Sequence, residues 1–364
     1  MKFLSEYRDP VLAKKYFEEI ERTVTQPWSI MEVCGGQTHS LVKNGIIDML
    51  PKTVSMIHGP GCPVCVTPIH LIDKAIHLAL EEGVILCSFG DMLRVPGSSI
   101  NLLEAKARGA DVRILYSPLE AVKIATDYPD RQVVFFAVGF ETTAPANALS
   151  VIHAHRARLN NFSILTSHVL VPPAIKAVIN DEESNIDGFL AAGHVCTIMG
   201  NSEYYPLAED YQVPIVVTGF EPLDVLQGIL MIIRQLESKK AVVENQYARI
   251  VRENGNLEAQ QIISEVFEIQ DQTWRGIGLI PESGYKIKSK FEQFDAQIKF
   301  DIDIEEKPEN SECISGQIMK GIKKPFECPH FGKKCVPSFP LGAPMVSSEG
   351  ACAAYYHFSG LAEV

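Results

Sequence analysis

Between about residues 29 and 240, short runs of β-branched and apolar residues alternate with segments of helical hydrophobic periodicity. Such alternation is typical of βαβ units, in which crossover helices join parallel strands. The strand runs are apolar almost throughout, which indicates that both faces of the sheets are covered. We therefore predict an α/β fold with mostly parallel sheets. The expected strands span residues 30–33, 53–58, 84–89, 112–116, 133–138, 163–168, 188–192 and 215–218. The expected helices span 68–82, 100–108, 144–159, 173–180 and 222–239.

The same region contains a possible internal repeat. Three pairs of short motifs match in order at nearly one offset, which predicts two homologous α/β halves. The alternative is that any two α/β segments look alike. The matched positions include Val33 with Val138, Pro68 with Pro173 and Gly90 with Gly193, at offsets of 105, 105 and 103 residues.

After about residue 240 the alternation stops. Two helix-like segments, 241–253 and 257–268, precede a stretch with Gly and Lys and then the acidic segment 300–312. The remaining tail is rich in Cys, Pro, Gly and Lys and has no clear hydrophobic period. A segment of this composition can bury little core of its own, so we expect a metal to stabilise it.

Four cysteines stand in this tail, with 14, 6 and 16 residues between successive members. Four thiolates can bind Zn²⁺ or a [4Fe–4S] cluster. The short C-x₂₋₄-C pairs usual for structural zinc are missing, and five lysines lie between residues 320 and 334, where Glu327 is the one acid. Because a four-thiolate cluster is an anion, this charge favours the cluster. Four unrelated buried cysteines are the remaining alternative. The four are Cys313, Cys328, Cys335 and Cys352.

A Gly-rich turn follows the first expected strand and begins with Cys34. The sequence Cys34-Gly-Gly-Gln-Thr-His39 indicates a strand that turns directly into a helix, at the edge of the sheet where open α/β folds bind ligands. A helix start and a nearby histidine both lower a thiol pKa. We therefore expect Cys34 to be a reactive thiolate or a metal ligand, with an incidental small residue in a turn as the alternative. Asp91, Glu141 and His194, at other strand ends, are expected to face the same cleft.

The next expected strand ends in Gly59-Pro-Gly-Cys-Pro-Val-Cys65, just before a helix. A CxxC pair at a helix start has the chemistry of a dithiol/disulfide couple, because the second thiol is close enough to form the disulfide easily. Zinc is the competing interpretation, but its other ligands would have to come from Cys34 or from distant residues. We favour a redox function for Cys62 and Cys65.

Charge and hydropathy exclude several classes of protein. The chain has 45 acidic and 33 basic residues, a net charge of −12, so we expect no general nucleic-acid binding. The longest apolar stretch, residues 215–233, is interrupted by Glu221 and Asp224, and the charged N-terminus does not resemble a signal peptide. We expect a cytoplasmic protein without a membrane span, where nine cysteines indicate metal or redox chemistry. No P-loop or complete dinucleotide-binding motif occurs, so the α/β layering does not imply NAD.

Taken together, the motif at Cys34, the motif ending at Cys65, Gly139-Phe-Glu-Thr-Thr-Ala-Pro145 and the four spaced C-terminal cysteines resemble the HypD family of [NiFe]-hydrogenase maturation factors. The resemblance covers essentially the whole chain. It implies two Rossmann-like domains and a smaller iron–sulfur domain that includes both chain ends. The expected domains are 29–118, 119–240, and 1–28 together with 241–364.

The resemblance also implies partners, cofactors and residue functions. Family members work with the small chaperone HypC to hold an Fe(CN)2(CO) group, for which HypE supplies cyanide. HypC then carries the group to the precursor of the hydrogenase large subunit. Cys34 would ligate this iron together with a HypC thiolate, Cys62 and Cys65 would be the redox dithiol, and the four C-terminal cysteines would hold a [4Fe–4S] cluster. Further polar groups near the site would be His39, His194 and Glu349.

Two other interpretations stay open on the residues alone. A free-standing thiol/disulfide oxidoreductase would need the cluster and the CxxC pair but not Cys34. A zinc-stabilised adaptor without chemistry would need only the C-terminal cysteines. Iron retained by Cys34 would distinguish an assembly scaffold from the oxidoreductase. Metal analysis would distinguish both of these from the zinc-stabilised adaptor.

Overall fold

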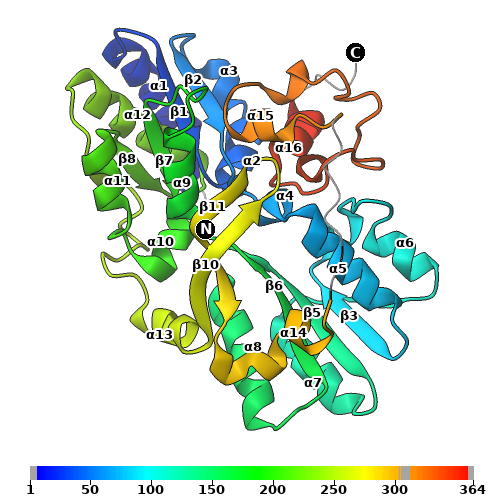
Figure 1. The fold of residues 1–364 in the computed structure, drawn as a ribbon. Helices are drawn as coiled ribbons and strands as arrows, with labels where there is room; N and C mark the ends of the chain where they lie inside the picture. Colours follow the sequence, from blue (N-terminus) through cyan, green and yellow to red (C-terminus); the bar gives the residue numbers. More distant parts are fainter. Residues whose placement is uncertain (1–5, 303, 305–311, 360–364) are drawn as a thin grey trace.

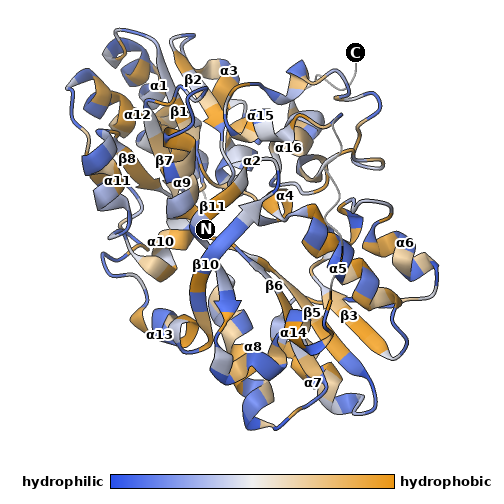
Figure 2. Cartoon of the chain, viewed as in Figure 1, coloured by the Kyte–Doolittle hydropathy of each residue, from blue (hydrophilic) through white to orange (hydrophobic). Residues whose placement is uncertain are grey.

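The structure is a computed structural model that describes residues 6–302, 304 and 312–359. Two parallel sheets packed with helices form most of the molecule, and the C-terminal segment lies against them (Figure 1). Figure 2 shows that the strands of the two parallel sheets are largely apolar, whereas β10 and many loops are hydrophilic. The predicted α/β fold with parallel sheets is confirmed.

The first sheet has five parallel strands. Its order is β2-β1-β7-β8-β9, so strands from two distant parts of the chain pair at its centre. Ile30 on β1, for example, is in register with Met56 on one side and with Gly188 on the other. The strands are β1 (Trp28–Glu32), β2 (Val54–His58), β7 (Gly188–Ala192), β8 (Ile215–Thr218) and β9 (Val243–Asn245).

The second sheet has four parallel strands in the order β4-β3-β5-β6, and all four come from the segment between β2 and β7. Its central strand β5 is buried over nearly its whole length. The strands are β3 (Val84–Ser88), β4 (Asp111–Ile114), β5 (Gln132–Gly139) and β6 (Phe162–His168).

If the strands of each sheet are numbered in chain order, the first four strands of both sheets have the spatial order 2-1-3-4. This shared order is consistent with duplicated Rossmann-like units. The second unit, however, is inserted into the first. The expected boundary between residues 118 and 119 falls between β4 and β5, which belong to the same sheet. The motif matches also pair non-equivalent strands. Val33 follows β1, the second strand from one edge of its sheet, whereas Val138 lies near the end of β5, the third strand of the other sheet. Local alternation does not reveal which strands pair across a sheet.

Several helices begin at residues whose side chains cap them. Ser117 and Glu120 form a capping box at α7, with Pro118 in the first turn, and Asn101 and Glu104 do the same at α6. The α-helices are α1 (Pro10–Thr23), α2 (Gly35–Lys43), α3 (Ile46–Met49), α4 (Pro63–Val66), α5 (Ile69–Leu80), α6 (Leu102–Ala107), α7 (Pro118–Asp127), α8 (Ala144–Arg156), α9 (Val171–Ile179), α10 (Gly193–Met199), α11 (Tyr204–Tyr211), α12 (Pro222–Glu237), α13 (Leu257–Val266), α14 (Ala296–Lys299), α15 (Ser315–Met319) and α16 (Ala351–Phe358). The 3-10 turns are η1 (Glu6–Arg8), η2 (Gly90–Arg94), η3 (Ser289–Phe294), η4 (Pro325–Glu327) and η5 (Ala343–Met345).

The region after residue 240 differs from the prediction. The helix expected over 241–253 is wrong, because Val243–Asn245 instead forms β9 and extends the first sheet beyond β8. The helix expected over 257–268 is confirmed as α13, although it ends at Val266. An antiparallel hairpin then follows, formed by β10 (Phe267–Trp274) and β11 (Gly278–Ile287). The hairpin contacts α9 of the first unit and β6 of the second, so it bridges the two (Figure 1).

The two chain ends pack on different parts of the molecule. Helix α1 lies against α12 and buries Ile20 in the core of the first unit, so this N-terminal helix joins the first sheet rather than the tail. In the tail, Ala343 and Val346 are buried in the core of the second unit. The segment therefore has little core of its own, as expected. Most of the acidic segment 300–312 lies outside the described residues. Within the described chain, no helix is long and apolar enough to cross a membrane.

Candidate functional site

A cleft of about 700 Å³ lies where the carboxyl ends of the two sheets meet. Residues after β2, β3, β4, β5 and β7 line it, and the tail residues 347–349 contribute to its wall. Residues at several strand ends thus meet at one cleft, as predicted, but Cys34, Cys62 and Cys65, which were expected to face it, are not part of its lining. Its polar lining includes Asp91, Thr142, Thr143, His194 and Glu349.

Cys34 is buried beside this cleft. It occupies the N-cap position of α2 directly after β1, so the predicted turn from strand to helix is confirmed. The residue is 2% exposed, and its Sγ lies 3.5 Å from Nδ1 of His194. Gly61 packs so closely on the backbone of Cys34 that no side chain fits between them. Only glycine allows this approach of two backbone segments.

The electrostatics at Cys34 differ from the expectation. Burial raises the pKa of the Cys34 thiol, and the nearby carboxylate of Glu349 raises it further. Backbone hydrogen bonds at the start of α2 lower the pKa, as predicted, but they do not outweigh burial. Burial also lowers the pKa of His194 to about 4, so its imidazole is neutral near pH 7. Cys34 is thus a neutral thiol beside a neutral histidine, not a free thiolate.

Cys62 and Cys65 form a disulfide, with their Cα atoms 5.2 Å apart. Cys62 is the N-cap of α4, and its Sγ accepts a hydrogen bond of 3.2 Å from the backbone N–H of Cys65. The CxxC pair therefore stands at a helix start, as predicted. Both residues are buried in the same core cluster as Cys34. In this state neither sulfur is a thiolate that could bind zinc.

Three polar residues from the sequence analysis take different positions. Glu349 lines the cleft next to Gly35. The residue as a whole is exposed, but reduced solvation of its carboxyl beside the cleft, together with the charge of Asp91, raises its pKa. His39 lies outside the cleft lining, with its ring centroid 5.1 Å from that of Phe358. The expectation that Glu141 faces the cleft is wrong. Its carboxylate is buried and accepts a hydrogen bond of 2.9 Å from the N–H of Val171, at the start of α9.

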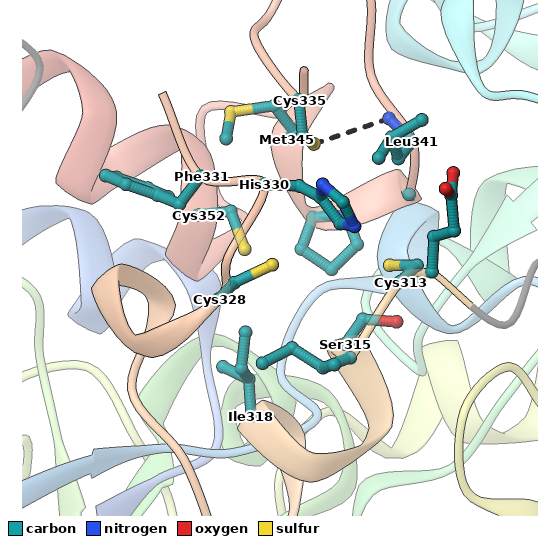
Figure 3. Close-up of a pocket in the computed structure, with 14 residues that line it drawn as sticks. Cys313, Ser315, Ile318, Cys328, His330, Phe331, Cys335, Leu341, Met345 and Cys352 are labelled. Atoms are coloured by element: carbon teal, nitrogen blue, oxygen red, sulfur yellow. Dashed lines mark hydrogen bonds between the residues drawn. The ribbon is translucent and has the colours of Figure 1, made fainter. Parts of the chain in front are cut away.

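The four C-terminal cysteines line one small pocket, apart from the cleft (Figure 3). The sulfur atoms of Cys328 and Cys352 face each other, and Cys335 Sγ accepts a hydrogen bond of 3.3 Å from the N–H of Leu341. Gly342 approaches Cys313 Sγ so closely that a methyl group there would overlap it. The tertiary structure thus brings together four thiols that are widely separated in the sequence.

Four thiols that line one pocket are a suitable donor set for a soft, thiolate-bound metal group. Burial and the proximity of the other three thiols raise the pKa of Cys352, so four thiolates need a cationic group to hold them together. As the side chains stand, the described residues contain no group of three or more His, Cys, Asp or Glu side chains arranged to hold one metal ion. A four-iron cluster tolerates wider spacing, because each thiolate binds a separate iron atom.

Sequence reasoning missed a buried polar network next to Cys34. Glu32 is fully buried at the end of β1, and its carboxylate accepts a hydrogen bond of 2.9 Å from the backbone N–H of Cys34. It also contacts the hydroxyl of Thr38 and, at 2.7 Å, Nδ1 of His58. His58 Nε2 lies 3.1 Å from the hydroxyl of Tyr355. A charged residue at the end of a strand whose last residues are buried, two positions before Cys34, was the signal that could have revealed Glu32.

The fold and the cysteine sites together define a two-unit α/β protein with a thiol and a disulfide buried in one core cluster beside the cleft, and with a separate four-cysteine pocket. Residues 11–359 match the family model HypD, described as "Hydrogenase formation hypA family". The chain therefore belongs to the HypD family of hydrogenase maturation factors, as its motifs predicted.

Named relatives are similar over nearly the whole chain. The chain is 47% identical to hydrogenase maturation factor HypD2 of Bradyrhizobium diazoefficiens, over 98% of this chain and 97% of that protein. It is also 47% identical to HypD of Azotobacter vinelandii, with the same coverage. It is 44% identical to HypD of Escherichia coli K12, over 98% of each chain.

Proposed function

We propose that this protein is the scaffold on which the Fe(CN)2(CO) group of a [NiFe]-hydrogenase is assembled, together with the chaperone HypC and the cyanide donor HypE. The observation that carries the proposal is the position of Cys34, a buried thiol at the cleft between the two α/β units, beside His194 and the Cys62–Cys65 disulfide. HypC would dock over the cleft and supply the second thiolate.

The surroundings of Cys34 suit a soft metal cargo. A low-spin iron with cyanide and carbonyl ligands prefers thiolate sulfur, and a bound cation stabilises the thiolate that burial disfavours. When the S–H bond is exchanged for an S–Fe bond, the thiol proton must leave, and His194, whose Nδ1 lies 3.5 Å from Sγ and which lines the cleft, is placed to relay that proton to the cleft.

The C-terminal cysteines would hold a resident [4Fe–4S] cluster, which supplies single electrons when bound. The pocket is close to the disulfide. Turn η5 contributes Pro344 and Met345 to the lining of the pocket, and on its other side it contacts α4, which Cys62 caps. This closeness supports a cycle of Cys62 and Cys65 between disulfide and dithiol during assembly.

Burial of the disulfide weighs against a free-standing oxidoreductase. Cys62 is 4% exposed and Cys65 is 2% exposed. A disulfide that exchanges with protein substrates must admit an attacking thiolate to one of its sulfur atoms. The cleft instead suits a small cargo held between two proteins.

The test is anaerobic purification with HypC, followed by infrared spectroscopy for cyanide and carbonyl stretches and by iron, sulfide and zinc analysis. Cys34→Ala should abolish the infrared bands but retain about four irons and four sulfides per chain. Cys87→Ala is the matched control, because Cys87 is buried in β3 away from the cleft lining, and it should keep the bands. Normal bands in Cys34→Ala would show that the iron is held elsewhere. Stoichiometric zinc without sulfide would exclude the cluster.

A further inference from the structure

The imidazole of His194 connects Cys34 to the cleft. Its Nδ1 lies 3.5 Å from Cys34 Sγ, and His194 lines the cleft whereas Cys34 does not. No second hydrogen bond to this ring is found among the described residues, so hydrogen bonding alone does not fix the plane of the imidazole. The orientation of Nδ1 toward the thiol therefore depends on what packs against the ring.

Phe220 is the aromatic neighbour of this imidazole. The centroids of the two rings lie 5.2 Å apart, with 43° between the ring planes. The contact follows from the first sheet, because β7 and β8 are neighbours and Ala192 is in register with Thr218. His194 and Phe220 each come two residues after this pair, so they leave the same edge of the sheet side by side. Phe220 is not part of the cleft lining, so it is placed to orient His194 and not to touch a group bound in the cleft.

The ring of Phe220 is packed against the start of α2. A Cβ on Gly36 would lie 3.1 Å from this ring and 3.6 Å from Cys34 Sγ, so the absence of a side chain on Gly36 leaves room for Phe220 beside the thiol. The ring of Tyr247 meets Phe220 edge to face, with the centroids 6.2 Å apart. Phe220 cannot turn away from His194 without displacing one of these neighbours.

The backbone before Phe220 is fixed as well. A side chain on Gly219 would overlap the carboxylate of Asp224. The N–H of Gly219 donates a hydrogen bond of 3.2 Å to Oε1 of Gln246, and the buried Asp224 accepts two hydrogen bonds from Arg249. A side chain locked in this way by its neighbours and its own main chain is suited to hold another side chain in one orientation.

We propose that Phe220 is a positioning residue that holds Nδ1 of His194 against the sulfur of Cys34. The functional consequence rests on the proposed function, in which His194 relays the proton that the thiol loses to iron. Without the ring of Phe220 the imidazole gains rotational freedom, and Nδ1 spends only part of the time within hydrogen-bond distance of Sγ. Proton transfer requires that contact, so iron is captured less efficiently although Cys34 and the fold are retained.

Nuclear magnetic resonance of the imidazole nitrogens tests the contact itself, on full-length protein purified without HypC and containing isotope-labelled histidine. The Nδ1 signal of His194 is assigned by its loss in His194→Ala. In otherwise wild-type protein, Cys34→Ala should shift this signal, because the thiol partner of Nδ1 is removed. In Phe220→Leu protein, the same Cys34→Ala change should leave the signal where it is. If Phe220→Leu does not fold, Phe220→Met replaces it, since a flexible Met side chain fills the gap better.

Phe17→Leu is the matched control. Phe17 is a partly buried ring on α1, and it packs on a different core cluster of the first unit from the one that contains Cys34. A merely structural effect of losing a ring would appear in both Leu variants. In Phe17→Leu protein, Cys34→Ala should therefore shift the His194 signal as it does in the wild-type protein.

Infrared spectroscopy of the HypC complex adds the functional readout. Phe220→Leu and His194→Ala should each lower the cyanide and carbonyl bands per chain by about tenfold or more. The double variant should lose no more than His194→Ala alone, because Phe220 acts through His194. A His194 signal that responds to Cys34→Ala equally in Phe220→Leu and wild-type protein overturns the positioning function, whatever the bands show. A wild-type protein that shows the response but forms no bands with HypC overturns the proposed function and leaves the contact intact.

Discussion

Replacing Gly61 with alanine is expected to displace Cys34 and to destabilise the protein. A Cβ on residue 61 would lie far inside the 3.0 Å that real Cβ atoms keep from other heavy atoms, and the atoms it meets are the backbone N and Cα of Cys34 and the carbonyl carbon of Val33. Rotation of a side chain cannot relieve this overlap, so the two backbone segments must move apart. A hydrogen bond of 2.9 Å from the N–H of Gly35 to the carbonyl of Gly61 joins these two segments, so the movement would weaken it.

Two terms set the size of the effect. Overpacking of a rigid site costs about 1–3 kcal/mol, and a weakened buried hydrogen bond costs about 1 kcal/mol more. The free energy of unfolding should therefore fall by about 2–4 kcal/mol. Displacement of a reacting group by about 1 Å can lower function by about a hundredfold. The cyanide and carbonyl bands of the HypC complex should then be lost, even where the variant folds.

Urea unfolding followed by circular dichroism measures the first effect, and infrared spectroscopy measures the second. Gly90→Ala is the matched control, because Gly90 also lines the cleft but a Cβ there would meet its nearest atom, in the side chain of Ile114, at 3.7 Å. Its stability should stay within about 1 kcal/mol of the wild-type protein. Equal stability of the two variants, with normal bands in Gly61→Ala, would refute the close approach of Gly61 to Cys34.

Two further predictions concern buried ionisable groups. Burial lowers the pKa of His168 from 6.5 to about 3, so the unfolded chain binds a proton that the folded chain does not, and stability falls as the pH decreases from about 6.5 toward 3. His168→Gln should flatten the decline of the urea midpoint between pH 7 and pH 4, and an unchanged slope would contradict this cause. Asp224 is fully buried and accepts hydrogen bonds of 2.7 and 2.6 Å from Arg249. Asp224→Ala should therefore cost about 3 kcal/mol, whereas Glu265→Ala at the exposed pair with Lys290 should cost less than about 1 kcal/mol. Equal losses in the two urea titrations would argue against this difference.

Local features of the molecule could be predicted from the sequence. Apolar runs and the glycines or prolines that end them indicated eight parallel strands, and they located Cys34 and the CxxC pair at two strand ends. These features depend on neighbours within a few residues, so the sequence expresses them directly. Family membership followed from the same motifs.

Where the sequence was misleading, contacts with a distant segment determined the local structure. Val243–Asn245 forms a strand because it pairs with β8 at the edge of the first sheet, although its helical periodicity predicted a helix. Glu141 points away from the cleft because its carboxylate accepts a hydrogen bond from the N–H of Val171. The first N–H groups of α9 have no acceptor within the helix.

By itself, the sequence determined the strands, the turns that carry the reactive cysteines and the family. The tertiary structure alone decided that one α/β unit is inserted into the other, that the four C-terminal thiols share a pocket, and that Cys34 is a neutral buried thiol. It also joined Glu32 to Tyr355, more than 300 residues away, through His58. Burial, desolvation and strand pairing depend on residues that meet only after folding, and no local pattern contains that information.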